Sequence, residues 1–349
     1  MINLREYMID HLRSLTTSLL DAENPVYTLR PEMVELMAIL RDFQSTAFVR
    51  QNDITEGETR TPNGLAVSPT MAAMCADDYV RTITFMRGAH AAILDIQKEF
   101  PERPVRVLYV GCGPYATLAV PLMTVLSSRE ISFTLLDVHP ESIDSVKTII
   151  NSLGLTDAVA SYETMDADSY RVSPDQPPDI ILMEIMQACL QAEPQVAITR
   201  HLLKQAQDSI LVPEEVRIDL ILTDISREFN FNSPQQYQGS TQRDRIAVSP
   251  VFTLNRETVK SWNCNQTNRL PASDVRIPSI LDERYQPMLF TTVQVYKNYV
   301  LRDYDSGLTC PRALSIGGAL KPGDTIKFHY ELGEHPGLHA EVSERLDKG

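Results

Sequence analysis

The middle third of the chain alternates short apolar runs with amphipathic ones, and no other feature restricts the possible folds as much. Three runs have the length and composition of buried strands: VRVLYV (105–110), ISFTLLDV (131–138) and DIILME (179–184). Two runs that open on proline predict helices: PESIDSVKTIINSLG (140–154) and PQVAITRHLLKQAQ (194–207). Strands that alternate with helices in this way predict βαβ units and a Rossmann-like, doubly wound parallel sheet.

The segments before this region favour helices. Apolar residues at helical spacing predict one helix in PEMVELMAILRDFQSTAF (31–48) and another in the long run 68–100, which we expect to bend at Gly88. The polar segment NDITEGETRTPNG (52–64) between them is rich in turn-forming residues and predicts a break.

The segments after residue 213 favour strands. EVRIDLILTDI (215–225) and LKPGDTIKFHYEL (320–332) alternate apolar and polar residues, and FTTVQVYKNYVL (290–301) is rich in β-branched and aromatic ones. The polar run 263–274 predicts a loop. The fold class is therefore α/β plus β.

Three parts follow from these patterns. They are an N-terminal helical region (1–100), a Rossmann-like domain (101–213) and a C-terminal β-sandwich or barrel domain (214–349).

Charge and composition narrow the class of partner. The 349 residues carry a formal net charge of −14, which argues against nucleic acid or an anionic membrane surface as the main partner. A cationic small molecule is compatible with this charge, and acidity that serves only solubility is the alternative. Neither a signal peptide nor a membrane-spanning segment is predicted, because no run of about 20 apolar residues occurs.

The cysteines and histidines predict neither a disulfide framework nor a metal site. The cysteines form no CxxC pair and indicate a reducing, cytoplasmic location; they are Cys75, Cys112, Cys189, Cys264 and Cys310. We expect His329 in a strand and both His335 and His339 in a terminal loop, a spacing that predicts surface roles.

A glycine turn follows the first strand of the predicted sheet. Gly111 and Gly113 would let a ligand approach the backbone where open α/β sheets bind ligands. Asp137 ends the second strand and could accept both hydroxyls of an adenosine ribose, or could instead cap the next helix. Asp166 or Asp168 could accept the adenine amino group, or be solvated loop acids. A nicotinamide cofactor, S-adenosylmethionine (SAM) and an empty turn all fit this pattern.

Two glutamates follow the third predicted strand. Glu184 stands at the tip of the strand, and Glu193 comes nine residues later, before Pro194. Taken singly, Glu184 could be a solvated strand end, and Glu193 could favour the positive end of a helix.

Taken together, these segments resemble the protein arginine methyltransferases. EIMQACLQAE (184–193) is similar to the double-glutamate loop of that family, and DYVRTITF (78–85) is similar to its N-terminal helix motif. The resemblance covers about residues 70–220. It implies SAM as cofactor, S-adenosylhomocysteine as product, and an Arg81 that holds the SAM carboxylate and orients Glu184.

Other positions depart from the family pattern. Tyr109 stands where the family usually has aspartate, and the run 185–188 replaces Trp-Met-Gly-Tyr. We find no Thr-His-Trp in the β region and no inserted arm of the kind that joins family dimers, although the resemblance still allows a homodimer. These departures favour a small guanidine over a protein substrate.

The chemistry of a guanidinium explains the pair of glutamates. Its pKa is above about 12, so its nitrogens are poor nucleophiles. Two carboxylates could take its N–H donors, and one could accept the proton released on methylation. We therefore expect a SAM-dependent N-methyltransferase that acts on free arginine or another small guanidine. Alternatives are a protein arginine methyltransferase, a non-catalytic SAM-binding protein and an NAD-dependent oxidoreductase.

Overall fold

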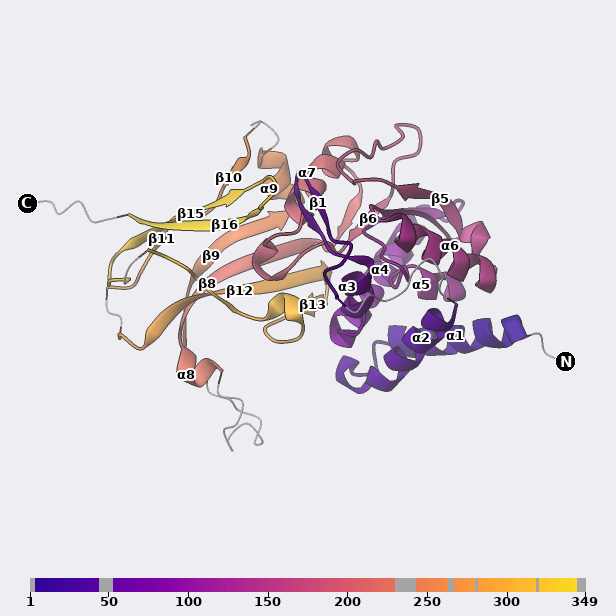
Figure 1. Cartoon of the computed structure of the whole chain (residues 1–349), viewed down its shortest axis with the longest axis horizontal. Helices are drawn as coiled ribbons and strands as arrows, with labels where there is room; N and C mark the ends of the chain where they lie inside the picture. Colours follow the sequence, from indigo (N-terminus) through magenta and orange to yellow (C-terminus); the bar gives the residue numbers. More distant parts are fainter. Residues whose placement is uncertain are drawn as a thin grey trace, which may run out of the picture.

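The computed structural model describes residues 4–43, 53–229, 243–262, 267–279, 282–317 and 320–343. Figure 1 shows two neighbouring parts, a parallel sheet surrounded by helices and a set of long antiparallel strands. The fold class predicted from the sequence is confirmed, since helices, a five-stranded parallel sheet and C-terminal antiparallel sheets are all present. None of the helices in the described ranges is long and apolar enough to cross a membrane.

The parallel sheet has the strand order β5-β4-β3-β6-β7. Its strands and their intervening helices are β3 (Val105–Val110), α5 (Val120–Val125), β4 (Ile131–Asp137), α6 (Pro140–Leu153), η2 (Thr156–Ala158), β5 (Val159–Thr164), β6 (Ile180–Met183), η3 (Ala188–Leu190), α7 (Gln195–Gln205) and β7 (Ile210–Val212). The order reverses between β3 and β6, which pair side by side in parallel. Ligands of open α/β sheets bind at such a reversal, beyond the carboxyl ends of the strands.

The helices before the sheet are α1 (Leu4–Leu20), η1 (Val26–Thr28), α2 (Arg30–Asp42), α3 (Pro69–Cys75) and α4 (Tyr79–Glu99). Of these helices, α4 contacts the sheet strands β3, β6 and β7, and α1 packs on α5, α6 and α4. The predicted helix 31–48 is present as α2 up to Asp42, and residues 44–48 lie outside the described ranges.

The predicted bend at Gly88 is wrong. The break lies at residues 76–78 instead, where Asp78 caps α4 by accepting from the backbone N–H of Arg81. Gly88 lies inside α4 at a point where strand β12 comes very close. A Cβ at this position would meet Cγ1 of Val295 at 2.5 Å. Glycine in this helix therefore permits a close approach and does not interrupt the hydrogen bonding.

A β-hairpin interrupts the region that we predicted as helical. Strand β1 (Thr59–Thr61) lies within the polar segment 52–64, which predicts only a break, and it pairs with β2 (Gly64–Ala66), which begins at the last residue of that segment. The turn between them ends on Gly64, whose φ of +140° is available to glycine but strained for other residues. A Cβ at Gly64 would also meet the carbonyl oxygen of Ala192 at 2.7 Å, so the hairpin lies directly against the loop after β6.

The C-terminal half forms two antiparallel sheets. One has the order β13-β12-β8-β9 with β14 beside β12, and in the other β15 pairs with β10, β11 and β16. Their elements are β8 (Glu215–Asp224), α8 (Ile225–Glu228), β9 (Arg245–Asn255), α9 (Arg256–Trp262), β10 (Arg269–Pro271), β11 (Val275–Arg276), β12 (Tyr285–Tyr296), β13 (Tyr299–Leu301), η5 (Gly307–Thr309), β14 (Arg312–Ala313), β15 (Thr325–Glu331) and β16 (Gly337–Ser343). The Phe252 ring of β9 stacks on the Tyr330 ring of β15, so side chains of the two sheets pack together.

Two expectations for this half are wrong. Part of the predicted loop 263–274 is strand β10, while residues 263–266, which include Cys264, lie outside the described ranges. His339 lies in strand β16 and not in a terminal loop; His335 does lie in the connection before it. Both strands form by pairing with β15, which the local sequence does not reveal.

Candidate active site

A cavity of about 400 Å³ opens beyond the carboxyl ends of β3 and β6, at the strand-order reversal. The β1–β2 hairpin, α3, the first turns of α4 and η5 also contribute to its lining. All the site residues expected from the sequence line this one cavity: Arg81, Gly111, Gly113, Asp137, Asp166, Glu184 and Glu193. Residues more than 100 positions apart in the chain are thus brought together.

The glycine turn and Asp137 form one wall. Gly111 and Gly113 both have positive φ, 67° and 62°, which lets the chain turn sharply after β3. The Asp137 carboxylate accepts from the backbone N–H groups of Gly113 and His139, each at 2.9 Å. Asp137 does not cap helix α6, whose N-cap residue is His139. The carboxylate is therefore fixed in place with lone pairs to spare, because it has about four acceptor sites.

In the loop after β5, the structure distinguishes Asp166 from Asp168, the two candidates for contact with the adenine amino group. Asp166 lines the cavity, and its burial raises the pKa of its carboxyl group above the usual value. Asp168 instead accepts from the Asn63 side chain of the hairpin turn at 2.9 Å. Asp166 is thus the carboxyl group available to a ligand, and Asp168 fixes the hairpin.

Arg81 and Glu184 form a buried ion pair. Only 13% of the Arg81 side chain and 11% of the Glu184 side chain are exposed, and Nη2 of Arg81 donates to Oε2 of Glu184. The other oxygen of Glu184, Oε1, is buried and has no hydrogen-bond partner among the described residues. Burial raises the pKa of Glu184 to about 7, against the opposing effect of Arg81. A buried acceptor without a donor is costly, so a donor from a ligand would stabilise it.

Glu193 is the second buried carboxyl group in this part of the cavity. It is 8% exposed, and burial followed by the nearby charge of Glu184 raises its pKa to about 8. It precedes Pro194, the N-cap of α7, and so lies just before the helix. The Cys75 thiol lies against Arg81, and burial raises its pKa to about 11, which keeps it neutral near pH 7. Tyr109, where the sequence departs from the family pattern, is also buried in the lining.

The loop between the two glutamates has an unusual backbone. Cys189, Leu190 and Ala192 have positive φ values of 61°, 55° and 65°, although none is glycine. Such conformations cost of order 1–3 kcal/mol each and persist only where surrounding contacts impose them.

The contacts that impose this conformation come from four separate segments of the chain. The N–H of Cys189 donates to Thr291 Oγ1 of β12 (2.9 Å), and the Tyr330 hydroxyl of β15 donates to the carbonyl of Leu190 (2.6 Å). Ala192 donates its N–H to the carbonyl of Pro336, while its own carbonyl accepts from Leu65 of β2. The C-terminal sheets and the hairpin thus fix the spacing of the two glutamates.

The chain shares its fold with a solved protein arginine methyltransferase. The Trypanosoma brucei PRMT1 enzyme–prozyme heterotetrameric complex with AdoHcy superimposes with a TM-score of 0.51 at 14% sequence identity. The match covers 79% of this chain and 94% of that one. Comparisons with protein-family models and with curated proteins give no match. The likeness therefore lies in the arrangement of the elements far more than in the sequence.

Several residues of the cavity were not expected from the sequence. The hairpin contributes Thr61 and Leu65, and α3 contributes Met71 and Cys75. The dipeptide Asn63-Gly64, which is typical of hairpin turns, is the signal that could have identified the hairpin. A further cation in the lining is Arg312 of β14, which no sequence motif marks.

Proposed function

We propose that the chain is a SAM-dependent N-methyltransferase whose acceptor is a guanidino group. The observation that carries this proposal is the buried group formed by Arg81, Glu184 and Glu193 in one cavity with the glycine turn. The fold shared with a protein arginine methyltransferase that was solved with AdoHcy supports it.

The cavity walls suit SAM. Asp137 has free lone pairs for the ribose hydroxyls, and the half-buried Asp166 offers an acceptor for the adenine amino group. Arg81 has five N–H donors, enough to engage a carboxylate of the ligand in addition to Glu184. When bound, SAM supplies an electrophilic methyl group on a positively charged sulfur. The role of this chain is to position and polarise the acceptor.

The two glutamates act on the acceptor in different ways. Glu184 is the fixed anion, since Arg81 holds one of its oxygens and the other has no partner in the part of the chain that the structure describes. Glu184 is paired with the cation Arg81, whereas the side-chain hydrogen bond of Glu193 comes from the neutral Gln187, so Glu193 is the better proton acceptor. A guanidinium between them would restore both to the anionic state and would be oriented by planar hydrogen bonds. Its positive charge is drawn toward the carboxylates, which leaves the attacking nitrogen more nucleophilic.

Arg312 favours a small acceptor that carries its own carboxylate. It lines the same cavity as the glutamates, and no ion pair engages it within the part of the chain that the structure describes. Free arginine and other guanidino acids have a guanidinium at one end and a carboxylate at the other, whereas an arginine side chain within a protein has no such carboxylate. Free arginine or a similar guanidino acid is therefore the proposed substrate class, with a protein arginine as the alternative.

One incubation tests the proposal. The purified chain is mixed with methyl-labelled SAM and, separately, arginine, guanidinoacetate, agmatine and an arginine-rich peptide, and the products are identified by mass spectrometry. Methylated arginine or guanidinoacetate is the expected product. A methylated peptide alone would assign a protein substrate, and SAM binding without methylation of any guanidine would contradict the proposed reaction.

The quaternary structure and compartment are separate parts of the proposal. We propose a homodimer in the cytoplasm, as the family resemblance and the cysteine pattern suggest. Light scattering on the purified chain measures the first, and imaging of a tagged chain in cells the second.

A further inference from the structure

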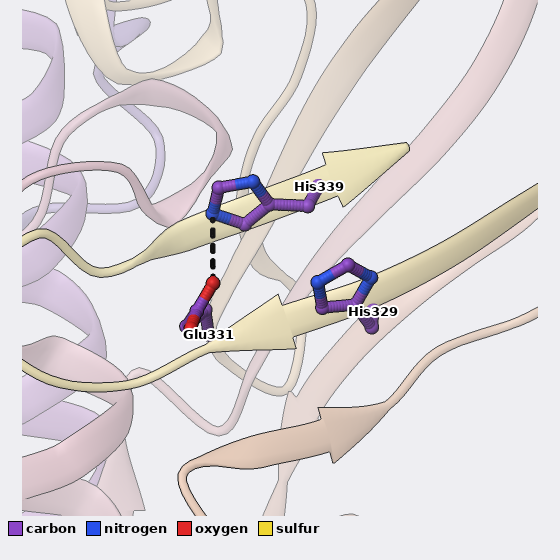
Figure 2. A group of neighbouring side chains, drawn as sticks. All are labelled: His329, Glu331 and His339. Atoms are coloured by element: carbon purple, nitrogen blue, oxygen red, sulfur yellow. Dashed lines mark ion pairs between the residues drawn. The ribbon is translucent and has the colours of Figure 1, made fainter. Parts of the chain in front are cut away.

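Three potential metal ligands meet on the outer face of the sheet formed by β15 and β16. His329 and Glu331 are two residues apart on β15, and side chains at this spacing share one face of a strand. His339 of β16 is the direct cross-strand partner of His329. Figure 2 shows the three side chains on the same side of the two strands.

Their ligand atoms are close together. One nitrogen of each histidine and one oxygen of Glu331 all lie within 4.8 Å of one another. Nε2 of His339 is 3.6 Å from Oε2 of Glu331, and the two imidazole rings stack with centroids 5.2 Å apart. Ligands 2.0–2.2 Å from a tetrahedral zinc ion lie about 3.4 Å from each other. His339 and Glu331 are exposed, so small side-chain rotations suffice to reach this spacing.

We propose that His329, Glu331 and His339 bind one divalent cation of the zinc class. Two imidazoles and a carboxylate suit Zn²⁺, Co²⁺ or Ni²⁺ better than Mg²⁺ or Ca²⁺, which prefer oxygen ligands alone. Three protein ligands leave a fourth position for water. The local sequence conceals this site, because His339 becomes a neighbour of His329 only through the pairing of β15 with β16.

Arg269 of β10 competes with the cation. Its guanidinium donates to Nδ1 of His329 at 3.0 Å, and this contact requires a neutral imidazole, the form that metals also require. A neutral imidazole that accepts at Nδ1 carries its proton on Nε2. His329 can therefore bind a metal only when Arg269 moves away. Removal of this guanidinium is expected to strengthen metal binding.

The site also adjoins the loop of the two glutamates. Tyr330, between the two ligands of β15, donates to the carbonyl of Leu190, and Pro336, just before β16, accepts from Ala192. A cation that joins β15 to β16 therefore stabilises the two strands on which that loop depends.

The test is a titration of the metal-free full-length chain with Co²⁺, followed by absorption, and with Zn²⁺, followed by calorimetry. One equivalent is expected to bind, without a thiolate-to-metal charge-transfer band that would indicate cysteine ligands. His339→Ala is expected to weaken binding at least about tenfold. His335→Ala, which removes a nearby histidine outside the cluster, is the matched control and should bind as the parent does. Arg269→Gln should bind more tightly than the parent.

Thermal unfolding supplies a second readout. Zn²⁺ that binds the folded chain raises its melting temperature, and this rise should vanish in the double variant His329→Ala/His339→Ala. The melting temperature of each variant without metal shows whether it is folded. The proposal is overturned if the folded double variant binds Zn²⁺ as tightly as the parent, or if the parent binds none.

Discussion

The two ends of the cavity differ in how complete they are without a ligand. At the glycine turn, two backbone N–H groups hold both oxygens of Asp137 at 2.9 Å. At the other end, Glu184 has a buried oxygen that no described residue contacts by a hydrogen bond, and burial raises the pKa of Glu184 to about 7 and that of Glu193 to about 8. The first end is preorganised, whereas the second needs a cation to complete it. Under the proposed function, binding energy at the second end is tied to the charge of the acceptor.

Replacement of Glu184 by glutamine should give the largest effect, because it changes the second end of the cavity and leaves the first intact. The variant removes the fixed anion beside the acceptor while it leaves the glycine turn and Asp137 untouched. We expect methyl transfer to fall about a thousandfold and SAM affinity, measured by calorimetry, to change little. Glu141→Gln on the exposed first turn of α6 is the control and should keep full activity. Unchanged turnover in Glu184→Gln would remove Glu184 from the mechanism.

Replacement of Asp137 by alanine tests the opposite end. Loss of a charged acceptor of two hydroxyls is expected to weaken SAM binding about 10- to 100-fold. Asp168→Ala, which removes the contacts of this carboxylate with Asn63 and Ser169, should alter SAM affinity much less. Equal losses of SAM affinity in the two variants would show that both aspartates act by shaping the cavity wall and that contact with the ribose contributes little.

The free energy of unfolding of Glu193→Gln measures how much the buried Glu193 carboxylate destabilises the chain without a ligand. The pKa of Glu193 is raised from 4.5 to about 8 in the folded chain, so between these pH values the folded chain keeps a proton that the unfolded chain has lost. This stabilisation is fully present below pH 4.5 and is lost as the pH rises through 8. Glutamine cannot ionise.

At pH 9 without ligand, the free energy of unfolding of the variant should therefore be about 1–3 kcal/mol higher than that of the parent. Near pH 4.5 the two chains should be alike. Denaturant titrations at both pH values measure the difference, and a variant less stable than its parent at pH 9 would contradict the burial argument.

Arg312→Gln gives the smallest expected effect and sharpens the assignment of substrate. Loss of a carboxylate partner should raise KM for arginine about tenfold and leave KM for agmatine, which lacks the carboxylate, unchanged. Arg276→Gln, at an exposed arginine of strand β11 outside the cavity, is the matched control. Similar losses with arginine and agmatine would assign Arg312 to the shape of the cavity and not to substrate selection.

The sequence predicts the parallel sheet well because its strands are buried on both faces and appear as uninterrupted apolar runs, as in 105–110 and 179–184. The site residues that follow these strands could be placed for the same reason, since carboxyl ends of parallel strands share one edge. β5 was not recognised, because its residues are only half-buried or exposed and lack that apolar signal.

The rest depends on contacts between distant segments. Gly88 resembles a helix breaker until β12 is seen against it, and Arg312 belongs to the cavity only through the pairing of β14 with β12. The left-handed residues Cys189, Leu190 and Ala192 carry no local signal for their conformation, because contacts with β12, β15, Pro336 and β2 impose it. Local propensity cannot report such contacts.

The backbone of residues 184–193 also has a consequence for how this architecture can change. Three of its residues adopt positive φ angles that persist only where contacts from other segments impose them. The C-terminal strands β12 and β15 supply two of these contacts and so help to fix the separation of Glu184 and Glu193. A graft that exchanged those strands for unrelated ones could retain nucleoside recognition and still lose the geometry of the acceptor pocket. Divergence in this half of the molecule is therefore expected to alter which acceptor is used before it alters which donor is bound.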